Sequence, residues 1–360
     1  MRLAADLAAG RNVVLPQVTY QRYVAHTQGA TTLTVTTPTD GSAVSGSPVA
    51  VTGTTAPGNT VYVSATNTDT TFATTGASAV AGPGGAFTIP VPVSGGTTVI
   101  TTVAVSPSGD TAHDQRSVFF DFVPGTKLLD VTDPDNDDNG PGNYAYPTSS
   151  NFQPGAFDLE DFQVWDSGSN VTFRVKTRDL SPTFGSPLGA QLVDVYVHEP
   201  GASPTSTQAA NGTTVLRNFT ISPAFAWSRL IQVQGFGQRY EDAQNHTVGT
   251  VGITANALSR YITFTVSKAS LGGTPGSGWS FVVVLTGQDG FSNDQARGFQ
   301  PLPQDFQFGV CATASSNAHC TANPGTVPKA IDVITPQGVS QATELDYTLG
   351  PVVLQGVTIP

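Results

Sequence analysis

The chain has 360 residues, of which 15 are basic and 26 acidic, giving a formal net charge of −11. We expect no face with the clustered positive charge that binds phosphate backbones, which excludes nucleic acid as a partner. No apolar run approaches the roughly 20 residues that span a bilayer, so no membrane span is predicted. Charged residues form only 11% of the chain while Gly (38) and Pro (26) are abundant. This composition and length predict an all-β protein of two domains, with short strands and tight turns.

The first 31 residues differ from the rest of the chain. Apolar residues one turn apart, followed by Gly10 as a stop, predict a short helix over residues 2–9. Asp6 interrupts the segment before any apolar signal core, which argues against a signal peptide. The segment that follows has no helix or sheet of its own to pack against. We interpret residues 1–31 as the end of a domain that this chain lacks.

Residues 32–123 alternate regularly between apolar and polar side chains. The runs "TLTVTTP", "VAVTGTT", "TVYVSAT", "GAFTIPVPV", "TTVITTVAVSPSG" and "RSVFFDFV" are separated by turn signals such as "APGN" and "GPGG". Six or seven strands over about 90 residues predict an immunoglobulin-like sandwich. This segment contains no Cys and no Trp, so it lacks the antibody-type disulfide core. A spacer role is the simplest interpretation.

Residues 126–360 predict a second, larger antiparallel β-sandwich. In "VTFRVKT" and "QLVDVYV" the valines recur at every second position, which is typical of half-buried strands. In contrast, "WSFVVVLTG" is a continuous apolar run, as expected of a central strand that is covered on both faces.

The acidic turn "DPDNDDNGPGNYAYPT" lies near the start of this second predicted sandwich. Asp133, Asp135 and Asp137 alternate, and Asp138 adds a fourth carboxylate. Ligands that are all oxygen suit Ca²⁺, which takes six to eight of them in flexible geometry. The motif is not an EF-hand, because the twelfth-position Glu and the flanking helices are missing. A solvated acidic turn without any ligand is an equally good interpretation of this motif alone.

A second acidic segment, "FQPGAFDLEDFQV", follows soon after. It places Asp158, Glu160 and Asp161 at the mouth of a predicted strand, where we expect them to supply further ligands. Tyr144 and Tyr146 have the spacing of neighbours on one strand face, and we expect at least one of them to have a packing role that fixes the acidic loop to the sheet.

Sugar binding needs exposed rings, which stack on C–H faces, beside groups that hydrogen-bond to hydroxyls. Trp165 lies beside a turn and is expected to be exposed, whereas Trp227 precedes an alternating strand and faces either way. The loop "GQDGFSNDQARGF" offers Gln288, Asp289 and Arg297 as a polar rim. An ordinary hairpin turn is the simpler interpretation of that loop.

The two cysteines, Cys311 and Cys320, close a short loop. They form a disulfide in an oxidising compartment or remain free thiols in a reducing one, and their spacing does not fit a zinc site. No pair of separated carboxylates suited to glycoside hydrolysis and no nucleophile elbow is evident. We interpret the chain as non-enzymatic.

The run "DPDNDDNGPGNYAYPTSSNFQPGAFDLEDFQVWDSGSNVTFRVKTRDL" resembles the start of the C-terminal domain of glucodextranases. Related domains occur in some amylopullulanases and surface-layer-associated proteins. The pieces "GSPLGAQLVDVYV", "AFAWSRLIQVQGFG", "GWSFVVVLTGQDGF" and "FQFG" follow in the order of that family, so the resemblance covers residues 126–360. The insert "CATASSNAHCTANPGTVP" departs from the pattern.

The resemblance implies a fold similar to family 9 carbohydrate-binding modules or DOMON domains, with structural calcium. Residues 32–123 resemble the immunoglobulin-like domain of the same enzymes, and residues 1–31 resemble the last helix and exit strand of a family 15 (α/α)₆ barrel. The family's catalytic glutamates belong to that barrel, and no position here matches them.

This resemblance implies a non-catalytic accessory region of a secreted α-glucan hydrolase of glucodextranase or glucoamylase type. Its expected partners are an α-glucan and the catalytic barrel of the parent enzyme, and its expected location is extracellular or at the cell surface. The alternatives are attachment to the cell envelope or purely structural support for the barrel.

Overall fold

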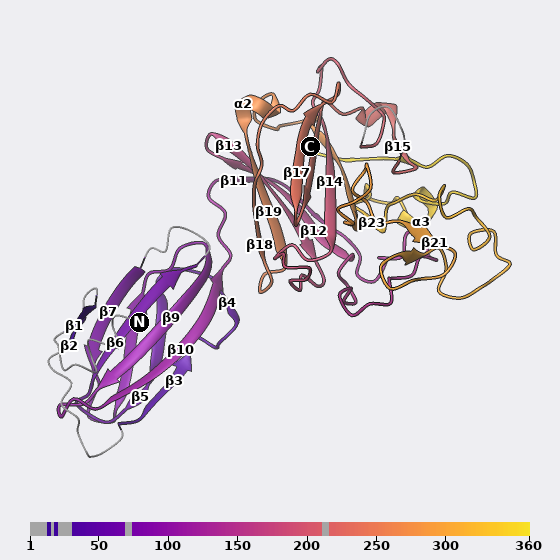
Figure 1. The fold of residues 1–360 in the computed structure, drawn as a ribbon. Helices are drawn as coiled ribbons and strands as arrows, with labels where there is room; N and C mark the ends of the chain where they lie inside the picture. Colours follow the sequence, from indigo (N-terminus) through magenta and orange to yellow (C-terminus); the bar gives the residue numbers. More distant parts are fainter. Residues whose placement is uncertain (1–12, 16–17, 21–30, 69–73, 211–215) are drawn as a thin grey trace. The chain divides into compact units, whose positions relative to one another are not determined.

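The structure is a computed structural model that describes residues 13–15, 18–20, 31–68, 74–210 and 216–360 (Figure 1). The chain divides into two compact units, one up to Phe122 and one from Val123 onward. Almost all regular structure in the described residues is β-strand, which confirms the all-β prediction. The helix expected over residues 2–9 lies outside the described residues. Near it, two short strands, Val13–Leu15 (β1) and Val18–Tyr20 (β2), pair antiparallel.

The first unit is a sandwich of two sheets. Its larger sheet has the order β4-β10-β9-β6-β7. The strands are Ser42–Val44 (β4), Thr111–Phe120 (β10), Gly96–Val105 (β9), Thr60–Asn67 (β6) and Thr74–Val80 (β7). The smaller sheet has the order β3-β5-β8. Its strands are Leu33–Thr37 (β3), Val49–Thr55 (β5) and Ala86–Val91 (β8).

The core of this sandwich comes from the alternation seen in the sequence. In β5 and β8 every second side chain is buried, including Val51 and Ile89, and these meet Val61 and Ile100 of the other sheet. The predicted immunoglobulin-like sandwich agrees with this arrangement. The two strands not predicted, β4 and β7, lie at the sheet edges; β4 is short, and no side chain of β7 is fully buried, so alternation is weak in both.

The second unit is built on two larger sheets (Figure 1). One has the order β11-β12-β13-β19-β18. Its strands are Thr126–Thr132 (β11), Leu159–Ser167 (β12), Asn170–Thr177 (β13), Tyr261–Ser267 (β19) and Gly252–Asn256 (β18). The other has the order β17-β16-β14-β20-β23, with β25 also paired to β20. These strands are Gly237–Asp242 (β17), Arg229–Gln234 (β16), Gln191–His198 (β14), Ser280–Gly287 (β20), Asp332–Val333 (β23) and Val357–Thr358 (β25).

Short elements complete the second unit. Two small parallel pairs join Thr220–Ile221 (β15) to Val353–Leu354 (β24), and Phe299–Gln300 (β21) to Phe308–Gly309 (β22). The helical pieces are Pro223–Phe225 (η1), Lys268–Leu271 (α2) and Gln341–Glu344 (α3). No helix in the described residues has the length and apolarity needed to cross a bilayer.

The central strand β20 is buried at every position, which confirms the prediction from its continuous apolar run. Its side chains alternate between two cores. Phe281 and Val283 point into the core between the two large sheets, while Val282 and Val284 point into a second core on the other side. The expectation that β14 is half-buried is wrong, because that second core also covers Tyr196. Figure 1 shows yellow C-terminal segments on this side of the sheet.

Of the two states considered for the cysteines, free thiols or a disulfide, the structure has the disulfide. Cys311 and Cys320 form a disulfide whose Cα atoms lie 5.4 Å apart. The bond closes a segment of irregular structure that follows β22.

Candidate metal and carbohydrate sites

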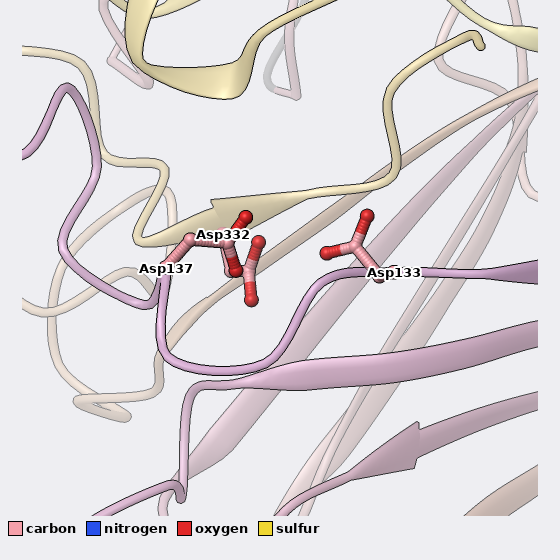
Figure 2. Close-up of side chains that lie close together, drawn as sticks. All are labelled: Asp133, Asp137 and Asp332. Carbon is pink, nitrogen blue, oxygen red and sulfur yellow. The ribbon is translucent and has the colours of Figure 1, made fainter.

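Three aspartates meet where the acidic turn passes the end of the six-stranded sheet. Asp133 and Asp137 come from the turn after β11, and Asp332 is the first residue of β23. Figure 2 shows their carboxylates gathered on one side of the turn. One carboxylate oxygen from each of the three lies within 4.8 Å of those from the other two. The part of the chain that the structure describes contains no other such group of metal-binding side chains.

Backbone contacts hold the acidic turn against the sheet. The Asp133 amide donates to the Glu160 carbonyl over 3.1 Å, and the Gly140 amide donates to the Ile331 carbonyl over 2.9 Å. Gly140 has a φ of +60°, and a Cβ there would lie 2.3 Å from the Tyr144 ring. Only glycine therefore fits both the left-handed backbone and the close ring.

The α3 helix adds a side-chain clamp. Gln341 donates from Nε2 to the Asp137 carbonyl and accepts the Val333 amide at Oε1 over 2.9 Å. One buried glutamine thus joins the acidic turn directly to β23.

Crowding of three carboxylates makes their ionised forms costly in the absence of a cation. Burial, with the charge of Asp137 beside it, raises the pKa of Asp133 to about 8. Burial and the charge of Asp158 raise the pKa of Asp137 to about 6. Asp332 is fully buried, and burial together with Asp133 raises its pKa well above the usual range.

Two of these oxygens have no partner within the described residues. Asp133 Oδ2 and Asp137 Oδ1 are buried and accept no hydrogen bond. Buried polar atoms are normally hydrogen-bonded, so two buried carboxylate oxygens without a hydrogen bond mark this group as a candidate cation site. Asp332, in contrast, accepts the amides of Leu159 and Val333, each over 2.7 Å, which fix its orientation.

The structure places the other predicted calcium ligands outside this trio. Asp158 is buried behind the turn, where it accepts the Asn136 amide and pairs with Arg178 over 3.0 Å. Asp138 accepts a hydrogen bond from the Tyr146 hydroxyl. Asp135 is exposed and belongs to no such group.

Glu160 and Asp161 do not supply the second segment of ligands that the sequence suggested. Glu160 pairs with Lys176 and Arg260, each over 2.7 Å. Asp161 accepts from the Tyr261 hydroxyl over 2.9 Å, on the outer face of the five-stranded sheet. A register shift between Leu159 and Asp161 interrupts the strand alternation here, and the partners of both carboxylates lie outside the acidic turn.

Both tyrosines of the turn have the packing role expected of them, although they lie in irregular structure rather than in a strand. The Tyr144 hydroxyl donates to the Pro328 carbonyl over 3.0 Å. The Tyr146 hydroxyl accepts the Phe157 amide over 2.9 Å and donates to Asp138.

The two tryptophans proposed for sugar binding have different surroundings. Trp227 is only 1% exposed, packs on Tyr196 and donates from Nε1 to the Gln208 carbonyl. It is a core residue, so its assignment to a sugar site is wrong. Trp165 is half-buried on the outer face of β12, where Nε1 donates to Gln163 over 2.9 Å.

Gln288, Asp289 and Arg297 line one pocket of about 960 Å³. The guanidinium of Arg297 is directed inward, however, and donates to the carbonyls of Gln288 and Phe306. The carboxylate of Asp289 accepts the amides of Phe291 and Ser292 and so shapes the turn. Neither charged group forms a free polar rim of the kind expected from the sequence.

Comparison with protein families matches residues 128–351 to the "C-terminal binding-module, SLH-like, of glucodextranase". The match covers more than half of the chain. The chain belongs to this family of glucodextranase binding modules. The resemblance stated from the sequence is therefore confirmed for this part of the chain.

No curated protein matches the chain. Among solved structures, the tetra-tandem repeat of a large adhesion protein shares 16% identity at a TM-score of 0.25. That match covers 73% of this chain and 46% of the adhesion protein chain, so this chain spans less than half of its length. A second match is a structure described as a carbohydrate-binding module of the β-sandwich superfamily, with 10% identity and a TM-score of 0.20. That match covers 66% of this chain and 92% of the other chain. TM-scores this low support no inference about the binding module.

Sequence reasoning missed Asp332, the residue of the binding module that completes the carboxylate trio. Its signal was a single carboxylate within the apolar run "AIDVI", followed by a turn. A charged residue at an otherwise buried strand position needs a partner, and that need was the available clue.

Proposed function

We propose that this chain is a non-catalytic accessory region of an extracellular α-glucan hydrolase, and that its second unit binds carbohydrate. The observation that carries this proposal is the match of residues 128–351 to a glucodextranase binding module. The first unit serves as a spacer, in keeping with its small apolar core. An α-glucan and the catalytic domain of a parent enzyme are the proposed partners.

We further propose that Ca²⁺ binds at Asp133, Asp137 and Asp332. The donor set supports it, because it consists of carboxylate oxygens alone, which hard cations such as Ca²⁺ prefer. The two buried oxygens without hydrogen bonds support it as well. A bound cation supplies the charge that offsets the mutual repulsion and thereby ties the acidic turn to β23.

Attachment to the cell envelope is the second candidate function. It is favoured by the description of the matched family as SLH-like, a term for surface-layer homology. In this case the module holds its enzyme at the cell envelope and has no need to bind soluble glucan.

Cosedimentation separates the two functions. The purified chain in calcium buffer is mixed with insoluble starch, with crosslinked dextran and with a cell-wall preparation. We expect it to sediment with the glucans and to be released by soluble glucan fragments. Sedimentation with cell walls alone, unaffected by soluble glucan, would favour attachment and contradict glucan binding.

A further inference from the structure

The pocket lined by Gln288 carries an unexpected set of phenylalanine rings. Phe184, Phe236, Phe291 and Phe306 all contribute to its wall. Phe291 is 96% exposed, Phe236 59% and Phe306 49%. Exposed phenylalanine rings gain free energy when they are buried, so three exposed rings around one hollow mark a contact surface.

Hydrogen bonds fix the backbone at Phe291, and ring packing fixes the Phe306 side chain. Asp289 Oδ1 accepts the amides of Phe291 and Ser292, over 2.9 and 3.1 Å, in a tight turn that leaves the Phe291 ring outside. Phe306 packs edge-on against Phe152, with ring centroids 6.3 Å apart. A contact surface that is partly fixed before binding loses less conformational entropy when a ligand arrives.

Arg297 links the backbone segments that carry Phe306 and Gln288. It donates to the Phe306 carbonyl over 2.7 Å and to the Gln288 carbonyl over 2.5 Å. Its guanidinium lies over the Phe152 ring at 4.9 Å, and the residue is 8% exposed. The arginine therefore fixes the pocket without offering its charge to a ligand.

The remaining lining is polar and carries no accessible cation. Amide side chains come from Gln288, Gln304 and Gln307, and an exposed carboxylate comes from Asp305, whereas Oδ1 of Asp289 is engaged in its own turn. Amides and carboxylates pair well with hydroxyl groups, whereas a polyanion would meet carboxylates and no free positive charge. The chemistry fits a neutral polyhydroxylated chain whose C–H faces stack on the rings.

We propose that this pocket is the glycan-binding site of the module and that it takes a neutral glucan segment rather than a uronate or sulfated polysaccharide. Phe291, Phe236 and Phe306 supply the stacking faces. This inference rests on the proposed carbohydrate-binding function and assigns that function to a place in the fold.

The test compares single variants of the full chain, in calcium buffer, by affinity electrophoresis through gels that contain soluble starch, dextran or pullulan. Phe291→Ala and Phe306→Ala are expected to weaken retardation, each by about tenfold in apparent affinity. Phe122→Ala is the matched control, because it removes a ring that is 57% exposed but lies in the first unit. Alginate and heparin gels test the preference for neutral chains.

Each outcome decides the inference. Loss of retardation in the pocket variants, with the control and wild type retarded by neutral glucans only, supports it. Retardation of all variants equally would overturn the pocket but leave carbohydrate binding in place. Failure of the wild type to bind any glucan would overturn both proposals. Because Phe291 is almost fully exposed, Phe291→Ala should keep the wild-type melting temperature, which separates lost binding from lost folding.

Discussion

The carboxylates of Asp133 and Asp332 lie within 4.8 Å of each other, although one follows the first strand of the second unit and the other begins its β23 strand. Both are largely buried, and burial raises the pKa of each; the charge of Asp133 raises the pKa of Asp332 further. An arrangement of this kind is unfavourable at neutral pH unless the charge is neutralised, either by protons or by a cation.

Neutralising one carboxylate should have opposite effects with and without calcium. In chelator, Asp137→Asn removes a repelling charge, so we expect a higher melting temperature than that of the wild type. In calcium, the same change removes a ligand, so we expect the variant to melt below the wild type. Differential scanning fluorimetry in both buffers measures this reversal.

Asp135→Asn is the control for that reversal, since it makes the same chemical change in the same turn at an exposed side chain. We expect its melting temperature to follow the wild type in both buffers. If Asp135→Asn and Asp137→Asn behave alike, the trio is not the calcium site.

Without calcium, stability should fall as the pH rises. The pKa of Asp133 is raised by burial to about 8 in the folded chain, against 3.8 as its ordinary value. Between these values the folded state binds more protons than the unfolded state, so the free energy of unfolding decreases with increasing pH. Asp137, with a pKa raised to about 6, adds to the effect.

Urea unfolding between pH 4 and pH 8 in chelator measures this slope, and adding calcium at each pH measures the protection. Calcium competes with protons for the same oxygens, so we expect its stabilising effect to grow with pH. Calcium protection that is constant from pH 4 to pH 8 would argue against binding at these carboxylates.

Arg217 should be among the most sensitive positions of the second core. It is fully buried and pairs with Asp194 over 2.8 Å and with Asp294 over 3.3 Å. Replacing it with Met leaves a buried carboxylate without its cation, which costs about 3–5 kcal/mol. Arg239→Met, at the partly exposed pair with Glu241, is the control and should cost about 1 kcal/mol or less. Equal urea midpoints for the two variants would refute this expectation.

The disulfide should stabilise the second unit by a modest amount. Cys311 and Cys320 are nine positions apart, and a loop of this size contributes about 2–3 kcal/mol through restriction of the unfolded chain. We expect the double variant Cys311→Ala, Cys320→Ala to unfold at lower urea concentration. Reductant should lower the wild-type midpoint to that of the double variant and leave the double variant itself unchanged.

Strand periodicity made much of the fold predictable. The continuous apolar run of β20 identified a strand buried on both faces, and the alternation in β5 and β8 identified a half-buried pair. These patterns are local, because each depends on side chains a few positions apart. The edge strand β7 was missed because its side chains are small and mostly exposed or half-buried.

The sites depended on contacts that local patterns do not contain. The sequence marked Asp133 and Asp137, but Asp332 reaches them only through the pairing of β23 with β20. Trp227 was ambiguous because it precedes β16, whose side chains face two ways, and the segments that cover the second face come from elsewhere in the chain. The same holds for the pocket: the loop from Gln288 was noticed, but Phe236 and Phe306 join it from separate segments.

The central claim is that the second unit binds a neutral α-glucan, and isothermal titration calorimetry tests it most directly. The calcium-loaded chain is titrated with fragments of dextran, starch and pullulan. The account predicts a saturable heat with at least one of them, reduced in Phe291→Ala. No heat with any glucan, from a chain whose melting temperature shows that it is folded and calcium-bound, would contradict the claim.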